Sequence, residues 1–346
     1  MAQNKFQRPA SAAMLPTTSV IVLNWNGRAL LAACLTSLAA QTAPNLDIIV
    51  VDNGSHDGSA QYVRAHWPTV RLLALPVNRG FSGGVNAGLA VARGEYLVLL
   101  NNDALAEPTF VEHLVAPFAD PHLGATAGVL VFAHQPQIVA SAGIRIHRDG
   151  VALDDRMLDD VAHLPTNPLP VWGASGGAVA YRRAALQDVG LFDEGYFAYL
   201  EDVDLAWRLR LRGWQTLLAP QARAAHVYSA TGGEGSPFKN WLVARNRWRV
   251  MLRCVPAELL RRDWLRIGQY EILACAQAAA RGRWTTITGR LATGREWRSL
   301  VAQRRVIQAR RTAEIAALDR WLLPARAPWH VIREAQALGK VLESRD

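Results

Sequence analysis

SVIVLN (residues 19–24), RALLAACLTSLAAQ (28–41) and LDIIVVD (46–52) begin a regular alternation of apolar strands and amphipathic helices. The alternation continues through a helix-like stretch at 57–66, VRLLAL (70–75), FSGGVNAGLAVARG (81–94) and EYLVLLNND (95–103). Continuously apolar strands separated by helices indicate a mostly parallel sheet with helices on both faces. Such sheets bind ligands at the carboxyl ends of their strands. We therefore predict an α/β fold with its functional site at that edge.

Outward from these strands the pattern weakens and then changes. A helix-like segment at 108–118 precedes residues 134–170, which are rich in Pro, Asp and His and predict a loop or lid. Order returns in VWGASGGAVAYRR (171–183) and in GYFAYLEDVDLAWRLRLRG (195–213), which predicts a strongly patterned helix. A Gly- and Ser-rich hinge, HVYSATGGEGSP (226–237), separates this part from a helical remainder. We expect a flexible N-terminus (1–16), an α/β catalytic domain (17–237) and a basic, Trp-rich helical region (238–346).

The charge of the chain is unevenly distributed. Of the 346 residues, 50% are hydrophobic, which suffices for a sizeable core and argues against disorder. The formal net charge is +9, yet residues 1–237 hold 16 Lys/Arg against 20 Asp/Glu, whereas residues 238–346 hold 22 against 9. A basic region with seven of the twelve tryptophans suits either nucleic acid or anionic lipid headgroups.

The helical remainder carries no recognised nucleic-acid motif, so we expect no nucleic-acid partner. Its apolar residues recur at helical spacing among arginines over 256–280 and 299–323. These helices either pack on the rest of the protein or lie on an anionic membrane surface.

Cysteine usage and the start of the chain bear on location. Cys34, Cys254 and Cys275 cannot form a paired framework and lack ligand-like spacing, which favours buried, inert thiols in a reducing compartment. The first 18 residues lack the apolar core of a signal peptide, and no run of about 18 apolar residues follows. We expect a cytoplasmic protein, with the cytoplasmic face of the inner membrane as a second candidate location.

Three of the first four strands end in polar clusters, namely Asn24-Trp25-Asn26-Gly27, Asp52-Asn53-Gly54-Ser55 and Asn101-Asn102-Asp103. Asp52 can accept a hydrogen bond from the imide N–H of uracil or thymine, and Trp25 offers a stacking face. The alternative is that DNGSHDG (52–58) is only a turn in which Ser55 or Asp57 caps the next helix.

The segment NRGFSGG (78–84) places an arginine and glycines before a helix, where backbone N–H groups and the helix dipole favour a diphosphate. Its spacing matches neither a Walker loop nor a Rossmann fingerprint. Asp103 ends a buried strand, where it either helps to hold a divalent cation or caps the strand. His226 either completes that metal site or is a satisfied surface histidine.

Three acids, Glu201, Asp202 and Asp204, stand at the start of a predicted helix. They either complement the helix dipole, with Asp204 and Arg208 as an i, i+4 pair, or carry out chemistry. Aromatic residues at 196, 197 and 199 directly precede the acids, as the wall of a sugar site would require.

In this order and spacing, the segments resemble glycosyltransferase family 2: VIVLNWNG, VVDNGSHDGS, NRGFSGGVNAGL, LLNNDA, GASGGAVAYRR and FDEGYFAYLEDVDLAWRLRLRGW, followed by His226. The resemblance covers roughly residues 17–250 and is closest to bacterial rhamnosyltransferase-type enzymes. It implies a GT-A fold, a nucleoside-diphosphate sugar donor, Mg²⁺ or Mn²⁺, inversion at the anomeric carbon, and a glycan or polyprenyl-linked acceptor of polysaccharide, O-antigen or cell-wall synthesis.

The resemblance also implies roles for single residues. It assigns Asp202, with Glu201, to the catalytic base, and Asp103 with His226 to the metal. It assigns the nucleotide sugar to Leu23, Trp25, Asp52, Asn78, Arg79, Gly80, Asn102 and Gly173. Arg245-Asn246-Arg247 resembles a basic motif that recurs after the catalytic domain.

One position departs from the family pattern, because Asn101 stands where many relatives carry an aspartate. The resemblance favours L-rhamnose from dTDP-L-rhamnose as donor. The alternative function is a non-catalytic nucleotide-sugar or carbohydrate-binding protein on a transferase scaffold.

Overall fold

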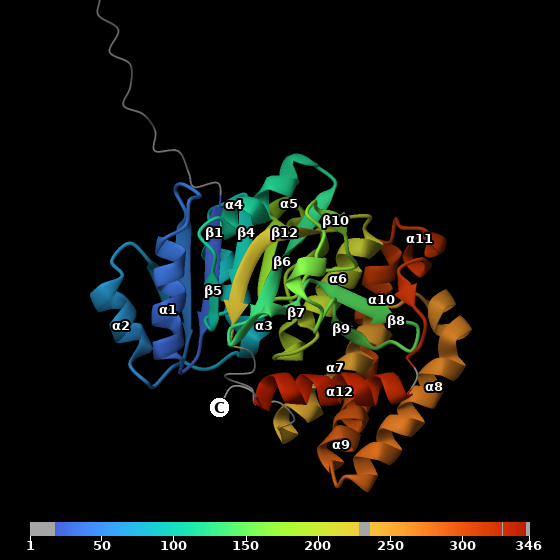
Figure 1. Ribbon diagram of the computed structural model, residues 1–346. Helices are drawn as coiled ribbons and strands as arrows, with labels where there is room; N and C mark the ends of the chain where they lie inside the picture. The colour runs from blue at the N-terminus through green and yellow to red at the C-terminus, as the bar shows by residue number, and fades with distance from the viewer. Residues whose placement is uncertain (1–17, 228–235, 327, 344–346) are drawn as a thin grey trace, which may run out of the picture.

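A computed structural model describes residues 18–227, 236–326 and 328–343. Its centre is a ten-stranded mixed sheet in the order β10-β12-β6-β11-β4-β1-β2-β3, with β5 paired to β12 and β7 to β6 (Figure 1). A small second sheet has the order β13-β8-β9. The strands are β1 (Thr18–Asn24), β2 (Asp47–Asn53), β3 (Arg71–Leu75), β4 (Tyr96–Leu100), β5 (Ala104–Ala106), β6 (Leu123–Phe132), β7 (Gln135–Ser141), β8 (Ile144–His147), β9 (Ala152–Asp154), β10 (Leu169–Pro170), β11 (Ala178–Arg182), β12 (Gln215–His226) and β13 (Leu322–Leu323).

Helices cover the large sheet on both faces and continue beyond it. The α-helices are α1 (Arg28–Ala39), α2 (Ser59–His66), α3 (Gly80–Val91), α4 (Phe110–Val115), α5 (Arg183–Val189), α6 (Glu201–Leu211), α7 (Pro237–Arg253), α8 (Ala257–Ala280), α9 (Trp284–Ala292), α10 (Trp297–Ala309), α11 (Ile315–Asp319) and α12 (Pro328–Glu343). Short 3₁₀ segments lie at η1 (Ala116–Ala119), η2 (Val161–His163), η3 (Glu194–Tyr196) and η4 (Thr293–Glu296).

The alternation of side chains along the strands explains the two layers of helices. Val20 and Val22 of β1 join a core with α1 and α4, whereas Ile21 joins the opposite core with α3, α5 and α6. Both cores consist of aliphatic and aromatic residues, so the apolar strands predicted from the sequence are buried on two sides.

The predicted parallel half is confirmed, since β1 pairs in parallel with β2 and β4, and β2 with β3. The carboxyl ends of β1, β2 and β4 therefore meet at one edge. The other half is mixed: β11 runs antiparallel to β4 and β6, while β6 and β12 are parallel. The sheet thus changes from parallel to mixed pairing at β11, which lies beside β4, the strand that leads to Asp103.

Residues 134–170 differ from the predicted loop. They contain β7, β8, β9, η2 and β10, and β8 and β9 form the small sheet with β13. These strands have between two and seven residues, and β9 is only partly buried. Such short, mixed strands show no hydrophobic periodicity, so the sequence pattern could not reveal them.

The helices after residue 237 share a core with the α/β part. Val203 and Trp207 of α6 cluster with Val250 of α7, Leu259 of α8 and Leu322 of β13. The division of the chain at 237 remains a prediction, and the expected flexible segment 1–16 and most of the hinge lie outside the described residues. Within the described residues, no helix is both long and apolar enough to cross a membrane.

The structure also places the three cysteines. Cys34 and Cys254 are buried, as predicted, whereas Cys275 is partly exposed. Burial raises the pKa of the Cys34 thiol to about 12. Burial likewise raises the pKa of Cys254 well above its usual range, so both thiols stay protonated at neutral pH.

Candidate active site

Amide side chains join the ends of three parallel strands. Asn102 Nδ2 donates to Asn24 Oδ1 over 2.8 Å, and Asn24 Nδ2 donates to an Asp52 carboxylate oxygen over 3.3 Å. All three side chains are buried, whereas Trp25 beside them is 40% exposed. The predicted nucleotide residues Trp25, Asp52 and Asn102 therefore lie together, and Trp25 has the exposed ring that stacking on a base requires.

The turn after β2 has a structural role as well. Ser55 N donates to Asp52 over 3.2 Å, while the Asp57 carboxylate accepts from Arg28 N over 2.9 Å and from Ser59 N over 3.0 Å. Asp57 thus caps the first residues of both α1 and α2. The alternative prediction that this turn caps a helix is confirmed for Asp57. The capping by Asp57 does not decide whether Asp52 binds a nucleobase.

Three N–H groups of the loop before α3 already have acceptors within the protein. Arg79 N donates to Asn53 Oδ1 over 2.9 Å, and Gly80 N donates to Asn78 Oδ1 over 2.8 Å. Ser82 N donates to Phe197 O over 3.2 Å. A diphosphate would compete with these acceptors for the three N–H groups, and its contact with Asn78, Arg79 and Gly80 remains a prediction.

Two further residues shape the same loop. Gly80 has φ +71°, and a β-carbon there would strike Phe197, so only glycine fits. The Arg79 guanidinium forms an ion pair with Glu194 over 2.9 Å, and both side chains are about half exposed. A diphosphate at this position would therefore share Arg79 with Glu194.

Asp103 and His226 lie together at the end of the sheet, on the segment after β4 and the last residue of β12. His226 Nε2 is 3.0 Å from Asp103 Oδ1, and Asn101 Nδ2 is 3.3 Å from the same imidazole nitrogen. Pairing of β12 with β5 fixes this arrangement, because His226 is opposite Ala104 in the ladder. Both side chains are buried, which is inconsistent with the alternative of a surface histidine.

This pair fits the protein's share of a divalent-metal site. A hard cation that bridges phosphates takes one or two protein ligands and completes its shell with water and phosphate oxygens. Among the described residues, no group of three or more His, Cys, Asp or Glu side chains has metal-binding geometry. Water and phosphate oxygens would supply the remaining ligands of a metal held by this pair.

A glycine loop connects Asp202 to the end of β4. Gly176 N donates to Asp202 Oδ2 over 3.0 Å, and the carbonyl of the next residue, Gly177, accepts from Asn101 N over 3.0 Å. Val203 N donates to the other carboxylate oxygen of Asp202 over 2.8 Å. Two adjacent glycines thus connect Asp202, the proposed base, to Asn101, which lies two residues before Asp103.

Of the two acids at the start of α6, Glu201 is buried and Asp202 is partly buried. Burial raises the pKa of Asp202, although hydrogen bonds from Gly176 and Val203 oppose the rise. Burial, reinforced by the charge of Asp202, raises the pKa of Glu201 well above its usual range. The N–H groups of Gly176 and Val203 thus favour the charged form of Asp202, whereas burial and the neighbouring charge disfavour the charged form of Glu201.

Comparison with known proteins identifies the family. Residues 19–190 match the family model described as Glycosyl transferase family 2. An N-acetylglucosaminyl-diphospho-decaprenol L-rhamnosyltransferase of Mycobacterium tuberculosis is 30% identical over 214 residues, which cover 56% of this chain and 70% of that protein. The chain belongs to glycosyltransferase family 2. A pre-mycofactocin glycosyltransferase of the same organism is 28% identical over 63% of this chain and 44% of its own length.

Solved transferases confirm the GT-A fold. GalNAc-T7 with UDP, GalNAc and Mn²⁺ aligns with a TM-score of 0.57 at 19% identity, over 69% of this chain and 48% of that one. A mannosyltransferase from Pyrobaculum calidifontis in complex with GDP-Man and Mn²⁺ aligns with a TM-score of 0.52 at 20% identity, over 89% of this chain and 87% of that one.

The aromatic wall expected beside the acids of this family member is only partly present. Tyr196 is fully buried, and its hydroxyl donates to Asp204 over 3.1 Å. Its ring lies under the guanidinium groups of Arg249 and Arg253, so it cannot face a sugar. The expectation is wrong for Tyr196 because α7 covers it. The predicted Asp204–Arg208 ion pair is confirmed at 2.8 Å.

Gly173 and Leu23 lie close to packed helices. A β-carbon on Gly173 would meet Ala206 of α6 at 2.5 Å, and one on Gly84 would strike Leu23. Close packing accounts for both glycines. Contact of Leu23 and Gly173 with the nucleotide sugar remains a prediction. In the loop that follows Gly173, Gly176 contacts Asp202 and Gly177 contacts the end of β4.

The sequence did not reveal Asp154 as part of this site. Asp154 ends β9, and its charge interacts with Asp202 and His226. Burial raises its pKa to about 6, with a smaller contribution from Asp202. Asp154 lies in a stretch that also holds acids at 155, 159 and 160 and reads as a solvated loop. Its electrostatic interaction with Asp202 and His226 follows from the placement of β9 beside β8, which the sequence pattern did not predict.

Proposed function

We propose that this transferase inverts the anomeric carbon of a nucleoside-diphosphate sugar while transferring the sugar to a hydroxyl group. The observation that carries the proposal is the partly buried Asp202 carboxylate, held by Gly176 N–H at 3.0 Å and joined through Gly177 to the strand that presents Asp103. Transfer by in-line displacement needs a base for the incoming hydroxyl and compensation for the charge of the leaving diphosphate. The site offers one group for each need.

Asp202 is the base in this proposal. Its raised pKa makes it a stronger proton acceptor than an exposed carboxylate. Glu201, protonated beside it, keeps the negative charge of the pair on Asp202. As the hydroxyl oxygen bonds to the anomeric carbon and the bond to the diphosphate breaks, the hydroxyl proton passes to Asp202.

Asp103 and His226 would hold Mg²⁺ or Mn²⁺ together with the donor phosphates. A bound divalent cation supplies charge neutralisation of the departing diphosphate. Arg79 adds a second positive charge if it exchanges Glu194 for a phosphate oxygen. Asn78 and Gly80 shape the loop that carries Arg79, because Gly80 N donates to Asn78 Oδ1, and they lie next to the diphosphate in this proposal.

For the donor, we propose dTDP-L-rhamnose, with Leu23, Trp25, Asp52, Asn102 and Gly173 around the nucleotide sugar. The support is the rhamnosyltransferase relative, which is 30% identical. The name of that relative also favours a lipid-linked acceptor of the polyprenyl-diphosphate class. Asp52 can accept a hydrogen bond from the imide N–H of thymine or of uracil equally well, so the nucleobase of the donor must be tested directly.

Thermal stabilisation with a panel of nucleotide sugars and Mn²⁺ tests the donor, and transfer to a polyprenyl-linked acceptor tests the activity. We expect dTDP-L-rhamnose to give the largest stabilisation. Asp202→Asn should retain donor binding and lose about 100-fold or more in turnover, since general bases contribute about 10²–10⁴-fold. Donor binding without turnover by the unchanged protein would instead indicate a non-catalytic binding protein.

We further propose that α8 contacts an anionic membrane surface. Trp264, Leu265 and Ile272 fall on one face of α8 and are 63%, 57% and 71% exposed. Arg261 and Arg266 are exposed on α8 itself, and the exposed Arg281 and Arg283 follow its C-terminal end. Figure 1 shows α8 and α9 at the outer edge of the molecule, on the side opposite α1 and α2. An apolar stripe bordered by arginine has the composition of an interfacial helix.

Flotation of the full chain with vesicles tests this contact. We expect binding to vesicles with anionic phospholipid and weaker binding to zwitterionic vesicles. Trp264→Ser with Ile272→Ser should abolish flotation, whereas Val91→Ser, which changes an exposed residue of α3, should not. Equal flotation of all three proteins, or of none, contradicts the proposal.

A further inference from the structure

The backbone just before the proposed base has an unusual conformation. Phe197, Tyr199 and Leu200 have φ values of +64°, +69° and +67°. Left-handed conformations are costly for bulky residues and persist only where the surroundings enforce them. Leu200 is the N-cap residue of α6, so this strained loop leads directly into Glu201 and Asp202.

A single side chain from α7 holds this loop. Asn246 is fully buried, and its Nδ2 donates to the carbonyls of Tyr196 (3.1 Å), Ala198 (2.8 Å) and Tyr199 (2.8 Å). Its Oδ1 accepts from Arg245 Nε over 3.0 Å. One end of the amide meets only carbonyls and the other a guanidinium, so its orientation is unambiguous. Arg245 also donates to the carbonyls of Gly195 and Tyr196.

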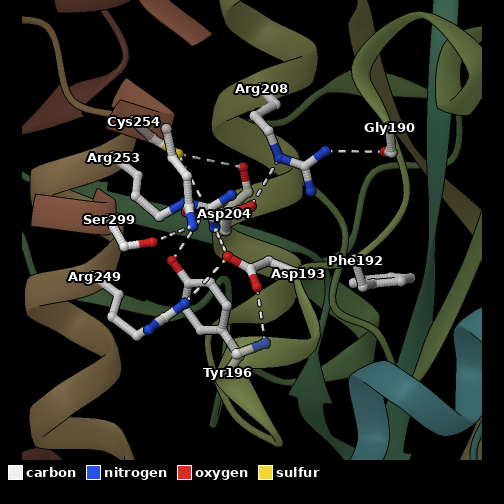
Figure 2. A network of polar contacts seen from close by, with 12 residues as sticks. Gly190, Phe192, Asp193, Tyr196, Asp204, Arg208, Arg249, Arg253, Cys254 and Ser299 are labelled. Carbon is white, nitrogen blue, oxygen red and sulfur yellow. Dashed lines mark hydrogen bonds and ion pairs between the residues drawn. The ribbon is translucent and has the colours of Figure 1, made fainter. Parts of the chain in front are cut away.

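A separate set of ion pairs fixes α7 to the same region (Figure 2). Arg253 contacts Asp204 at 2.6 Å and Asp193 at 2.7 Å, and Arg249 contacts Asp193 at 3.1 Å. Asp204 also binds Arg208 within α6. Because these pairs hold α7 against α6 without Asn246, a change at Asn246 affects mainly the backbone of the loop.

We propose that Asn246 is a positioning residue for the catalytic carboxylates: it enforces the left-handed backbone of 197–200, so that α6 begins at Glu201 and Asp202 reaches Gly176 N–H. The proposal deepens the proposed function and rests on it. Without the amide, the three carbonyls turn toward water and the loop relaxes to ordinary backbone angles. Asp202 then leaves Gly176 and becomes more hydrated.

The test uses the full chain with Asn246→Asp, which keeps the shape but places a carboxylate against the carbonyls, and Asn246→Leu, which removes the donor without adding charge. Val243→Ala, on the same helix, is the matched control. We expect both Asn246 variants to lose about 100-fold in kcat, the usual effect of misplacing a catalytic group by about 1 Å. The dissociation constant for the nucleotide sugar should stay unchanged.

The pH profile of kcat separates positioning from general loss of structure. Hydration of Asp202 lowers its pKa and outweighs the lost hydrogen bond from Gly176, because burial is the larger cause of the shift. The acid limb should therefore move to lower pH in both Asn246 variants and stay in place in Val243→Ala. Partial unfolding would lower the amount of active enzyme without moving the limb. If the Asn246 variants do not fold, Arg245→Met, which removes the other hydrogen bonds to the loop, should give the same lowered kcat and shifted limb.

Asp202→Asn, assayed together with the Asn246 variants, distinguishes failure of the positioning role from failure of the proposed function. Inactive Asp202→Asn with fully active Asn246 variants and an unmoved acid limb would overturn the positioning role and leave the proposed function intact. Loss of kcat without any shift of the limb also counts against it. Turnover retained by Asp202→Asn would overturn the proposed function and this inference together.

Discussion

At the scale of single residues, the site concentrates acids in positions that water does not reach freely. Burial raises the pKa of Glu201, Asp202 and Asp154. By contrast Asp204, one turn further along α6, has a lowered pKa, because the charges of Arg253 and Arg208 outweigh its burial. Four acids on neighbouring elements thus divide into three whose pKa is raised and one whose pKa is lowered.

Glu201→Gln tests the pH dependence that follows. A carboxyl whose pKa is raised by folding binds its proton more tightly in the folded state, so the free energy of unfolding falls as pH rises from its ordinary pKa of 4.5 toward the raised value. Relative to wild type, Glu201→Gln should therefore gain stability as pH rises above 4.5. Melting temperatures across this range measure the difference, and parallel curves for the two proteins would contradict it.

Asn101→Asp tests the ligand set of the metal site. The Asn101 amide lies 3.3 Å from His226 Nε2, so an aspartate there adds a second carboxylate beside Asp103. Ligand charge controls the affinity of such sites for hard cations. We expect half-maximal activity at a Mn²⁺ concentration about tenfold lower, and at a higher concentration in Asp103→Asn. A metal titration with unchanged midpoints in both variants would rule out this site.

The sequence identified some of these residues and missed others for a physical reason. Asp103 and Asp202 follow local patterns, a buried strand and a helix start, which the chain displays within a few residues. Asn246 acts on carbonyls 47 to 50 residues earlier in the chain, and its motif gave no sign of that target. Glu194, the partner of Arg79, is similarly distant at 115 residues.

At the scale of secondary-structure elements, α7 contributes more to the site than its position after the hinge suggests. Its buried arginines meet Asp193 before α6 and Asp204 within α6. Burying an ion pair costs desolvation energy. Removing one partner nevertheless destabilises the fold, because the other charge is then buried without compensation. The strands β1–β4 were predictable from continuous apolar runs, whereas this use of α7 depends on contacts that no periodicity encodes.

Arg253→Met tests the coupling of α7 to α6. It leaves Asp204 buried with one partner fewer, so we expect destabilisation of about 3–5 kcal/mol, the usual effect of breaking a buried pair. The double variant with Asp204→Asn should recover part of that loss, because no uncompensated charge remains. Urea unfolding of wild type, both single variants and the double variant measures the coupling. Additive losses would show that the two residues act independently.

At the scale of the whole molecule, two parts of opposite charge share one apolar core. The acidic part before residue 238 and the basic part after it meet at α6, where Trp207 packs with Met251 and Leu259. α12 crosses back to the large sheet, and its Leu338 and Leu342 pack on the core that contains β1. The helical region thus completes the fold at two places.

Truncation tests this dependence. A chain of residues 1–237 should fail to fold, because it exposes Val203 and Trp207 and leaves Asp204 without Arg253. A chain of residues 1–326 keeps α7 to α11 and should retain its near-UV circular dichroism with a lower melting temperature. Native circular dichroism from the shorter chain would show that the α/β part is self-sufficient.

The hydrogen bonds from Asn246 to the loop before α6 also limit which segments can be exchanged between relatives of this enzyme in a chimera. A chimera joined in the Gly- and Ser-rich segment 226–237 would combine the loop of one parent with the α7 of another. Asn246 and the arginines at 249 and 253 would then face a backbone with which they did not evolve. Recombination should preserve turnover only when the crossover lies outside residues 193–253, so that this segment is inherited as one block.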